Sequence, residues 1–470
     1  RHQGLNLQTE IIRAGFEWDV TDAVSLSYLF GHVESEVYTQ TNSTNDAING
    51  RLPFQSFPGF LVFVGTPIGE LNYNSHEVRL AYDNDGAFRG EIGGFHSNGI
   101  DKDFFNFGFF APVLPGDDVM PLFPSSPGLF LISETVTETD VWAVFFAATY
   151  EFWSDRARLN FEGRYTSEEK DIGRGAQNDT FKYFTPRITA EWDITDSTLL
   201  YVSAARGVKA GGFNSPPSLF MGEPLVAGEE KYDPDKNWTY EAGVKSSLWD
   251  NRIQLTGAVF YIDWNELQIN SRPTTPPALV GIIMPGDPVP GITSNLGDAR
   301  VFGVELEGVA SVTEQLTVNA GFSYANAEYE DGTISQRLLR LGGCDDIVCP
   351  IDGDIGGKEL ARTSPLQANV GAIWEDQFFN TDLGYYVRGD LTWQSRQWGS
   401  EVNSAKIPSR TLVNGIAALT HDNWEVQLWA KNIFNEKYVN NAFVVFTSAS
   451  SYAPAIAPKR TFGVTFKAKF

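Results

Sequence analysis

Residues 460–470 read RTFGVTFKAKF, a stretch in which apolar and polar side chains alternate without a break. Successive side chains of a strand point to opposite faces, so the two kinds separate. One face carries Phe462, Val464, Phe466, Ala468 and Phe470, and the other carries Gly463, Thr465, Lys467 and Lys469. A soluble sheet usually buries such an apolar face, whereas an outer-membrane barrel turns it to lipid and keeps the polar face wet. One strand is compatible with both, and the rest of the chain decides between them.

The composition suits a large barrel or a multidomain protein. At 470 residues the chain exceeds the usual size of one hydrophobic core. Its 42% hydrophobic residues and mean hydropathy of -0.21 are ordinary for a soluble protein, but an aromatic fraction of 13% is high. The net charge of -24 excludes nucleic-acid partners, which need a basic surface.

No apolar stretch approaches the roughly 18 residues of a membrane-spanning helix. The nearest is VWAVFFAATY at 141–150, which is apolar on both faces and leaves its own phase undetermined. If the chain crosses a membrane, it must do so with strands, because only helices and closed barrels satisfy every backbone group in lipid.

Strongly alternating segments occur in pairs along the chain. Within a pair the connection is a short polar turn, and these turns follow Val20, Asp83, Asp155, Ile194, Asp250, Val312, Trp374 and Thr420. Between pairs the connections are long and rich in Gly, Pro, Ser, Asn and Asp, at about 40–73, 107–135, 168–180, 214–236, 271–298, 331–364, 396–409 and 438–457. Short periplasmic turns that alternate with long external loops are typical of a bacterial outer-membrane barrel. The sequence therefore predicts an all-β fold, an antiparallel transmembrane β-barrel with all short turns on one rim.

The alternation also predicts which side chains face lipid. We expect the apolar row Val318, Phe322, Val426, Leu428, Val464 and Phe466 to point outward. The polar row Glu305, Glu307, Asn319, Glu425, Gln427 and Lys467 is expected to line a hydrated interior. A slip of one residue would place charges in hydrocarbon at a cost of about 2–4 kcal/mol each, so the register is well specified.

Several stretches of the chain carry a family resemblance. They are HEVRLAYD at 76–83, RGVKAGGFNSPP at 206–217, YDPDKNWTYEAGVKSSLWDNRIQLTGAVFYIDW at 232–264, SNLGDARVFGVELEGVASVTEQLTVNAGFSYANAEYEDG at 294–332 and AKNIFNEKY at 430–438. With the aromatic carboxy terminus, Phe470, they resemble the TonB-dependent outer-membrane receptors of the siderophore and iron-complex type. The match runs from about residue 184 to the terminus and is carried by the order and spacing of the pieces.

The resemblance implies a barrel of about 22 strands, plugged by a separate amino-terminal domain. Counting back from the terminus gives roughly seventeen strands, the first of which runs toward the periplasm. We therefore expect residues 1–470 to be the C-terminal part of such a barrel, without its plug, its TonB box and its first strands. The strand near Gln8–Trp18 and the strand 460–470 are then expected to be sheet edges.

The resemblance also implies a function and partners. It implies import of a scarce nutrient, most often a ferric siderophore or another iron complex, across the outer membrane of a Gram-negative bacterium. The TonB-ExbB-ExbD complex would drive import through the missing part. Lipid, lipopolysaccharide and the barrel-assembly machinery are further expected partners, with Phe462, Val464, Phe466 and Phe470 as the assembly signal. A cobalamin or oligosaccharide importer, a passive porin-like channel and an adhesive barrel remain alternatives, because fold does not settle function.

Basic and aromatic residues near strand ends are candidates for a ligand-binding vestibule. They are Arg206, Lys209, Tyr232, Arg272 and Arg300, with Trp238, Trp264 and Trp398 as further aromatics. Guanidinium and ammonium groups could meet an anionic ferric chelate. The alternatives are contacts with lipopolysaccharide or carboxylates for the cations and membrane-interface positions for the aromatics.

Other motifs predict local structure and exclude an enzyme. Cys344 and Cys349 stand five apart in a long external loop, which favours a disulfide over a metal site. Asp345, Asp346, Asp352 and Asp354 could hold Ca²⁺, but such a run is more often a solvated loop. The five His are scattered, and no motif of a hydrolase, metalloprotease or phosphate-binding loop occurs, so we expect no catalytic set and no cofactor.

Overall fold

The computed structural model describes residues 4–42, 62–65, 68–111, 120–121, 131–173, 175–214, 225–271, 292–295, 297–335, 353–379, 381–403, 405–444 and 452–468. All regular structure in these residues is β-strand, which confirms the predicted fold class. Searched for a long apolar helix of the kind that crosses a membrane, the described residues contain none.

The described residues form long strands and short ones. The long strands are β1 (Gly4–Thr21), β2 (Val24–Asn42), β4 (Ile68–Asp83), β5 (Phe88–Ala111), β7 (Leu131–Phe152), β8 (Ala157–Ile172), β9 (Gln177–Thr195), β10 (Thr198–Lys209), β13 (Asp235–Leu248), β14 (Ile253–Asn265), β17 (Ala299–Ser311), β18 (Leu316–Tyr329), β19 (Leu366–Gln377), β20 (Gly384–Gln394), β23 (Arg410–His421), β24 (Trp424–Lys431) and β27 (Thr461–Ala468). The short strands are β3 (Val62–Gly65), β6 (Met120–Pro121), β11 (Gly212–Phe213), β12 (Lys231–Tyr232), β15 (Gln268–Ser271), β16 (Ile292–Asn295), β21 (Gln397–Trp398), β22 (Lys406–Ile407), β25 (Val439–Val444) and β26 (Tyr452–Ile456).

The long strands belong to one antiparallel sheet. Counted over the described residues, this sheet has 19 strands, of which β3 and β6 are short, so 19 minus 2 leaves 17 long strands. This number confirms the strand count predicted from the sequence. The remaining short strands pair two by two, for example β15 with β16 and β21 with β22.

The chain divides into two compact units. The first unit comprises Arg1–Ala148, Glu162–Thr185 and Ala210–Tyr232, and the second comprises Thr149–Phe161, Pro186–Lys209 and Asp233–Phe470. Strands β7, β8 and β9 run from one unit into the other.

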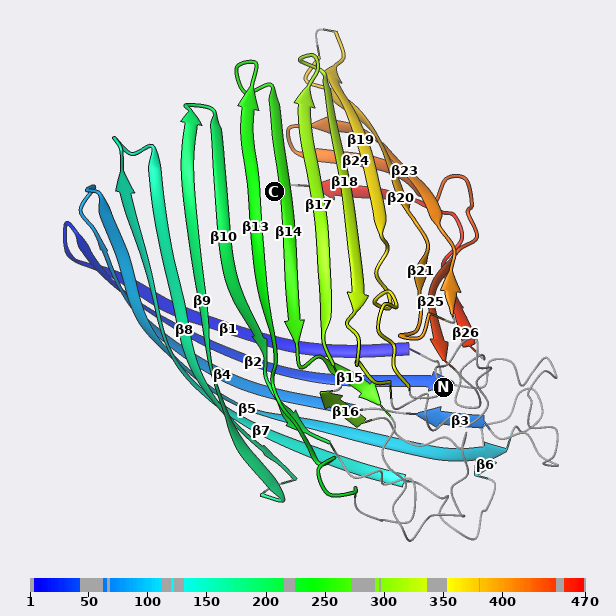
Figure 1. Cartoon of the computed structure of the whole chain (residues 1–470). Coiled ribbons are helices and arrows are strands. Elements are labelled where there is room, and N and C mark those ends of the chain that lie inside the picture. Colours follow the sequence, from blue (N-terminus) through cyan, green and yellow to red (C-terminus); the bar gives the residue numbers. More distant parts are fainter. Residues whose placement is uncertain are drawn as a thin grey trace. The chain divides into compact units, whose positions relative to one another are not determined.

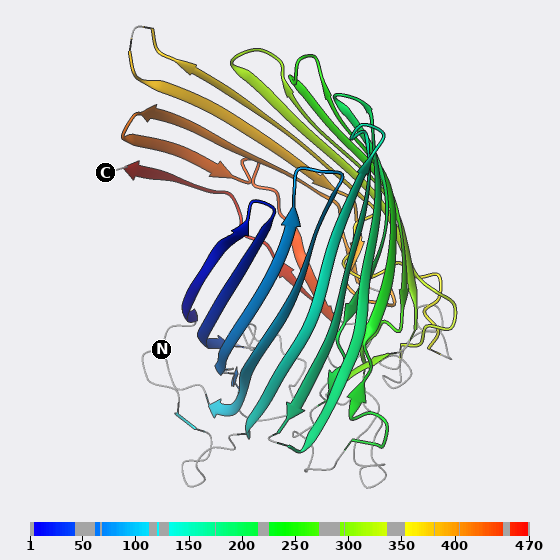
Figure 2. The same cartoon turned by 90° about the vertical axis from the view of Figure 1, so that its left-hand side faces the viewer.

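In the first unit, β1, β2, β4 and β5 lie side by side (blue in Figure 2). The backbone N–H of Asp83 donates to the carbonyl of Ala23 at 2.9 Å, so the turns at 21–23 and 84–86 are neighbours. Val78 and Leu80 are exposed on one face of β4, whereas Arg79 between them forms an ion pair with Glu77 on the other. The structure also sets the phase of 141–150: Trp142 and Val144 are exposed, and Phe145 lies beside Arg79 on the polar face.

In the second unit, β13, β14, β17 and β18 lie side by side (Figure 1). Backbone hydrogen bonds join each short turn to the next: Ser247 donates to Ser197, Ser311 to Arg252, and Glu375 to Gln315, at 2.8, 2.8 and 2.9 Å. The predicted grouping of the short turns at one end is therefore confirmed for this part of the sheet.

One predicted turn is wrong by a few residues. The turn expected after Trp374 instead follows β19, which continues to Gln377, and the N–H of Phe378 closes the turn on the carbonyl of Leu383 at 2.9 Å. The acidic pair at 375–376 suggested a turn, but both residues stay in the ladder opposite Tyr386 and Tyr385. Charged side chains at a water-exposed strand end do not interrupt backbone pairing.

The last hairpin shows the two rows that the sequence predicted. Leu428 lies opposite Val464 and Val426 opposite Phe466, and the side chains of Leu428 and Phe466 are 58% and 66% exposed. On the other face, Gln427 and Lys467 donate to Glu425 at 2.6 and 3.1 Å. The predicted separation into an apolar and a polar row is confirmed in this ladder.

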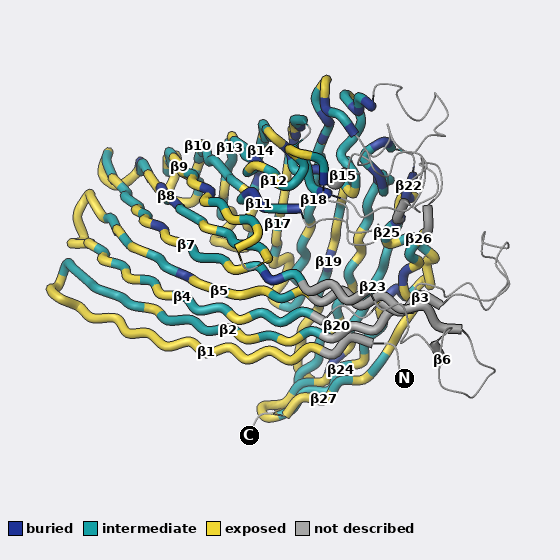
Figure 3. The backbone as a smooth tube through the Cα atoms, turned by 90° about the horizontal axis from the view of Figure 1, so that it is seen from below, coloured by how far each residue is buried: buried dark blue, intermediate teal, exposed yellow. Residues whose placement is uncertain are grey.

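Each unit contains one edge of the sheet. Among the described residues, β1 pairs with β2, and β27 pairs with β24, each along one side only. Exposed residues run along β1, as the tube in Figure 3 shows. Buried residues gather instead where the long connections leave the second unit's strands, at the end opposite the short turns.

Candidate functional site

The long connections of the second unit fold into a packed structure, here called the outer platform, formed by residues 264–269, 292–295, 297–301, 327–335, 353–366, 395–403 and 405–407. Its hydrophobic core consists of Leu267, Ile269, Ala299, Tyr329, Ile355 and Val402, with Trp264 and Leu360 packed against it. Ile355 and Ala299 are 0% exposed. Burial raises the pKa of Tyr329 to about 12. Trp264, a candidate ligand contact or membrane-interface residue from the sequence, instead packs against this core.

Buried hydroxyls tie the platform segments together. The backbone N–H of Asp298 donates to Oγ1 of Thr333 at 3.1 Å, and that hydroxyl donates to the carbonyl of Asp298 at 3.0 Å. The hydroxyl of Ser335 donates to Oε1 of Glu401 at 3.2 Å. Because buried polar groups without partners are costly, these bonds fix the relative position of three loop segments.

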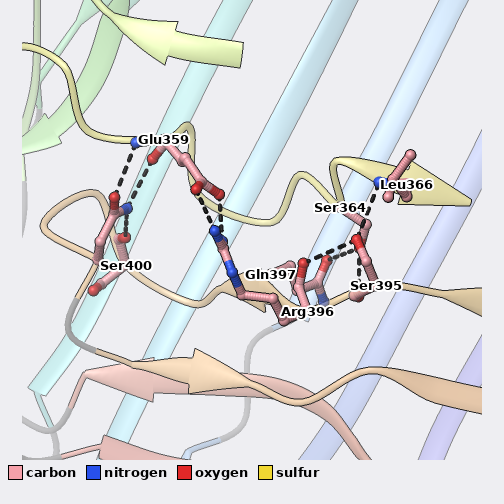
Figure 4. Close-up of polar contacts among 8 residues, drawn as sticks. Glu359, Ser364, Leu366, Ser395, Arg396, Gln397 and Ser400 are labelled. Carbon is pink, nitrogen blue, oxygen red and sulfur yellow. Dashed lines mark hydrogen bonds and ion pairs between the residues drawn. The ribbon is translucent and has the colours of Figure 1, made fainter. Parts of the chain in front are cut away.

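A bidentate ion pair between Arg396 and Glu359 links two segments of the platform (Figure 4). Nη1 and Nη2 of Arg396 each donate to one carboxylate oxygen of Glu359 at 2.5 Å. This hydrogen bonding raises the pKa of Arg396. The side-chain amide of Asn403 donates to the carbonyl of Glu359 and accepts from its N–H, at 2.8 and 2.9 Å. The guanidinium carbon of Arg396 also lies 5.2 Å from the ring centre of Trp398.

A hydroxyl and amide network lies next to this ion pair (Figure 4). The side-chain amide of Gln394 donates to Oγ of Ser364 at 2.7 Å. Ser364 in turn donates to Oε1 of Gln397 at 3.4 Å. The N–H of Leu366 donates to Oγ of Ser395 at 3.0 Å. The network holds the start of β19 against the end of β20. Hydrogen bonds therefore connect the platform directly to the ends of these two strands.

The predicted vestibule residues of the second unit take different positions. Arg300 lies on β17 at the platform, and its Nη2 is 3.5 Å from Oε2 of Glu328. Arg206 and Lys209 are three apart on β10 and so point to opposite faces. Arg206 lies opposite Trp238, which stacks on Tyr240 on the apolar face. The structure thus places Lys209 and Arg206 on different sides of the wall.

Tyr232 lies in the first unit, in what we call the outer corner, formed by residues 168–173, 175–181, 210–214 and 229–232. Strand β12 pairs Tyr232 with Gly212, and burial raises the pKa of the Tyr232 phenol. Next to it Phe181 is 4% exposed, with the ammonium groups of Lys170 and Lys231 at 5.8 and 5.2 Å from its ring centre. Residues 210–213 (AGGF), from the RGVKAGGFNSPP stretch, form part of this corner.

Several predicted site residues lie outside the described residues: Arg272, Cys344, Cys349, Asp345, Asp346, Asp352 and Phe470. Of the acidic run, Asp354 is described, and its Oδ1 accepts the N–H of Gly356 at 2.8 Å and of Gly332 at 3.3 Å. This carboxylate therefore holds a turn. A search for groups of three or more metal-ligating side chains finds none in the described part of the chain.

The sequence analysis did not single out Arg410. It begins β23 on the face shared by Gln394 and Arg388, and its guanidinium carbon lies 5.0 Å from the ring centre of Tyr438. Its Nη1 is buried and has no hydrogen-bond partner among the described residues. Tyr438 is the last residue of the AKNIFNEKY stretch, which carries part of the family resemblance. Nothing in that stretch predicts its contact with Arg410.

A hollow of about 740 Å³ in the second unit lies on the apolar face. Its lining includes Leu200, Val202, Val259 and Leu306, all of them exposed. Such a face suits lipid tails better than a polar ligand.

Fold and site together define a class of protein. Long antiparallel strands with one apolar and one polar face, short turns at one end and folded loops at the other are the features of a large outer-membrane β-barrel. A model of the family described as TonB dependent receptor-like, beta-barrel, matches residues 2–433. The chain therefore belongs to the TonB-dependent receptors, whose members are barrels of the Gram-negative outer membrane.

Curated relatives share part of the sequence. The probable TonB-dependent siderophore receptor PiuA of Acinetobacter baumannii is 24% identical over 260 residues, which cover 55% of this chain and 30% of that protein. The ferrioxamine receptor of Yersinia enterocolitica is 21% identical over 300 residues, covering 62% of this chain and 35% of the receptor. The matches span about a third of the length of these relatives.

Solved structures share the fold. The ferric yersiniabactin uptake receptor FyuA from Yersinia pestis superposes with a TM-score of 0.71 at 15% identity, covering 99% of this chain and 62% of that one. The siderophore receptor PiuA gives a TM-score of 0.67 at 16% identity, over 98% of this chain and 64% of that one. At this identity the likeness shows the fold alone.

Proposed function

We propose that the protein is an outer-membrane receptor that imports a ferric siderophore or another iron complex. The observation that carries the proposal is the family match over residues 2–433, together with curated relatives that are named as siderophore receptors. The outer platform supports it, because a packed external structure offers a fixed surface to a ligand, whereas an open channel has no need of one. Fold alone would not distinguish the two.

We also propose that residues 1–470 are the barrel portion of a longer receptor with an amino-terminal plug and further strands. The share of the relatives that the chain matches, 30% and 35%, supports this division. In that receptor the TonB-ExbB-ExbD complex would supply energy through the part outside this chain. The lumenal polar rows, such as the one around Glu425, would then hydrate and hold the plug.

Within the second unit, we propose Lys209 and Arg410 as candidate contacts for an anionic ligand at the outer end of the barrel. Lys209 and Arg410 lie on the polar face. Arg300 lies on the same face of β17 as the exposed Phe302 and Leu306, so contact with lipopolysaccharide is the better proposal for it. Arg206 belongs to the opposite face with Trp238, where contact with lipopolysaccharide is the better proposal. Tyr232 is the corresponding candidate in the first unit.

The test is uptake by the native host under iron limitation. Deleting the gene should abolish accumulation of one radiolabelled iron chelate from a panel that includes ferric citrate, ferrichrome and ferrioxamine, and the intact gene should restore it. Collapsing the proton gradient should stop uptake in the restored strain. Uptake that continues without the gradient would favour a passive channel, and unchanged uptake of every chelate in the deletion strain would contradict iron import.

A further inference from the structure

One arginine on the polar face of the first unit differs from its neighbours. Arg164 lies on β8, and its Nε donates to Oγ1 of the buried Thr166 at 3.3 Å. Its guanidinium carbon lies 4.9 Å from the ring centre of Phe95 and 5.9 Å from that of Phe145. Within the described part of the chain it forms no ion pair with a carboxylate, and its two Nη groups have no hydrogen-bond partner.

Arg79 provides an internal comparison. Its guanidinium carbon lies 5.3 Å from the same Phe145 ring. It pairs with Glu77 at 2.6 Å and with Glu91 at 3.3 Å. Two arginines thus lie near one phenylalanine, and the described residues supply carboxylates to Arg79 and not to Arg164.

The Phe145 ring packs directly against the backbone at Gly93. A Cβ atom at Gly93 would lie 2.2 Å from Cζ of Phe145, so the ring occupies the space that a side chain at residue 93 would take. Arg164 is seven residues beyond Ala157, the first residue of β8. At about 3.3 Å per residue this is roughly 23 Å along the strand, which is membrane depth in a tilted barrel.

The Nη groups of Arg164 are suited to a ligand that carries a carboxylate. Its Nη groups form a planar fork that matches the two oxygens of a carboxylate, and such charge-assisted pairs are stronger than neutral hydrogen bonds. The two nearby rings reduce hydration of the cation and help to hold it in place. In a chain of net charge -24, an arginine with no carboxylate partner among the described residues is suited to receive external negative charge.

We propose that Arg164 is a binding site for an oxyanion on the polar face of β8, partway along the strand. The shared chemistry is a carboxylate, carried either by the imported molecule or by a protein segment that enters the barrel. The first source rests on the proposed import function, and the second requires only the barrel. Phe95, Phe145 and Thr166 act as positioning residues for the guanidinium.

The test is the reactivity of individual arginines in the full-length protein, purified in detergent. Phenylglyoxal modifies guanidinium groups, and peptide mass spectrometry gives the rate at each residue. The reagent is applied in chloride buffer, with added ferric citrate as the anionic probe, and in 1 M sodium chloride, which screens ion pairs. Arg79 is the paired control, and the exposed Arg252 is the hydrated control. No variant is required, so a failure to fold cannot confuse the result.

Protection of Arg164 by at least tenfold relative to Arg252, relieved by 1 M salt, is the expected result. If protection requires ferric citrate, the oxyanion belongs to a free solute; if it is present without added anion, a carboxylate of the protein supplies it. A rate equal to that of Arg252 in every buffer would overturn the proposal, and so would protection that salt does not relieve, since that is steric. The measurement involves no transport, so it stands or falls independently of the import assay.

Discussion

Glu359 and Arg396 face each other fork to fork, with both nitrogen–oxygen distances at 2.5 Å, and join two loop segments of the outer platform that are 37 residues apart in sequence. The pair is partly exposed, at 26% and 36% of the two side chains. Its geometry, with Asn403 bound to the backbone of Glu359, makes it the strongest polar link that we find in the described platform.

Replacing Arg396 by Ala should loosen the platform. Bonds to charged groups contribute about 1.5–3 kcal/mol when protected, and partial exposure lowers the expected loss to about 1–2 kcal/mol. The measurement is hydrogen exchange of the backbone amide of Glu359, which donates a hydrogen bond to Oδ1 of Asn403. Arg300→Ala is the matched control, because its contact with Glu328 is 3.5 Å long and exposed, and it should change stability by less than about 1 kcal/mol. Equal effects of the two substitutions would contradict the assigned role of the ion pair.

The two rows of β24 should respond differently to a charge. Val426→Arg places a guanidinium on the apolar row and should lower the free energy of unfolding in detergent by about 2–4 kcal/mol. Gln427→Arg places it beside Glu425 on the polar row and should be tolerated. Urea unfolding of the full-length protein, followed by tryptophan fluorescence, gives both values. A similar loss at both positions would show that the assignment of faces is wrong.

Gly211 should not accept a side chain. A Cβ atom there would lie 2.5 Å from the backbone oxygen of Tyr232 and 2.4 Å from the ring of Phe181. Because a backbone atom cannot rotate away, Gly211→Ala should destabilise the outer corner by about 1–3 kcal/mol. Gly94→Ala is the control, since a Cβ atom there meets nothing within 4 Å. Limited proteolysis of the corner reads out the difference, and equal cleavage of both variants would refute the close approach.

The ion pair between Asp179 and Lys231 should make the outer corner weakly sensitive to acid. The hydrogen bond from Lys231 lowers the pKa of the Asp179 carboxyl below its ordinary value of 3.8. A lowered pKa contributes stability above the unfolded-state value, and this contribution is lost as the pH falls through the folded-state value. Asp179→Asn should therefore cost less than about 1 kcal/mol at pH 7, because the pair is exposed, and nothing once the pH is well below 3.8. Urea unfolding of both proteins across this range checks the convergence, and a difference that grows on acidification would contradict it.

The sequence by itself determined the strands, their turns and their two faces. Alternation is a local property with a period of two residues, so the positions of Val426 and Gln427 on opposite sides of a strand can be read without any tertiary structure. The same holds for short turns, whose polar residues cannot continue a strand into lipid. The sequence failed at Trp374 because an acidic pair at a strand end is compatible with either a turn or a continued ladder.

The outer platform and the pairing of each charge were decided only by the tertiary structure. Glu359 meets Arg396, and Arg410 at the start of β23 meets Tyr438, through contacts between segments that share no period in the sequence. Arg79 and Arg164 look equivalent as isolated polar-row residues, yet among the described residues only Arg79 has carboxylate partners. The reason is physical: alternation fixes the face on which a side chain lies, but its electrostatic environment depends on which strands and loops become neighbours when the sheet forms.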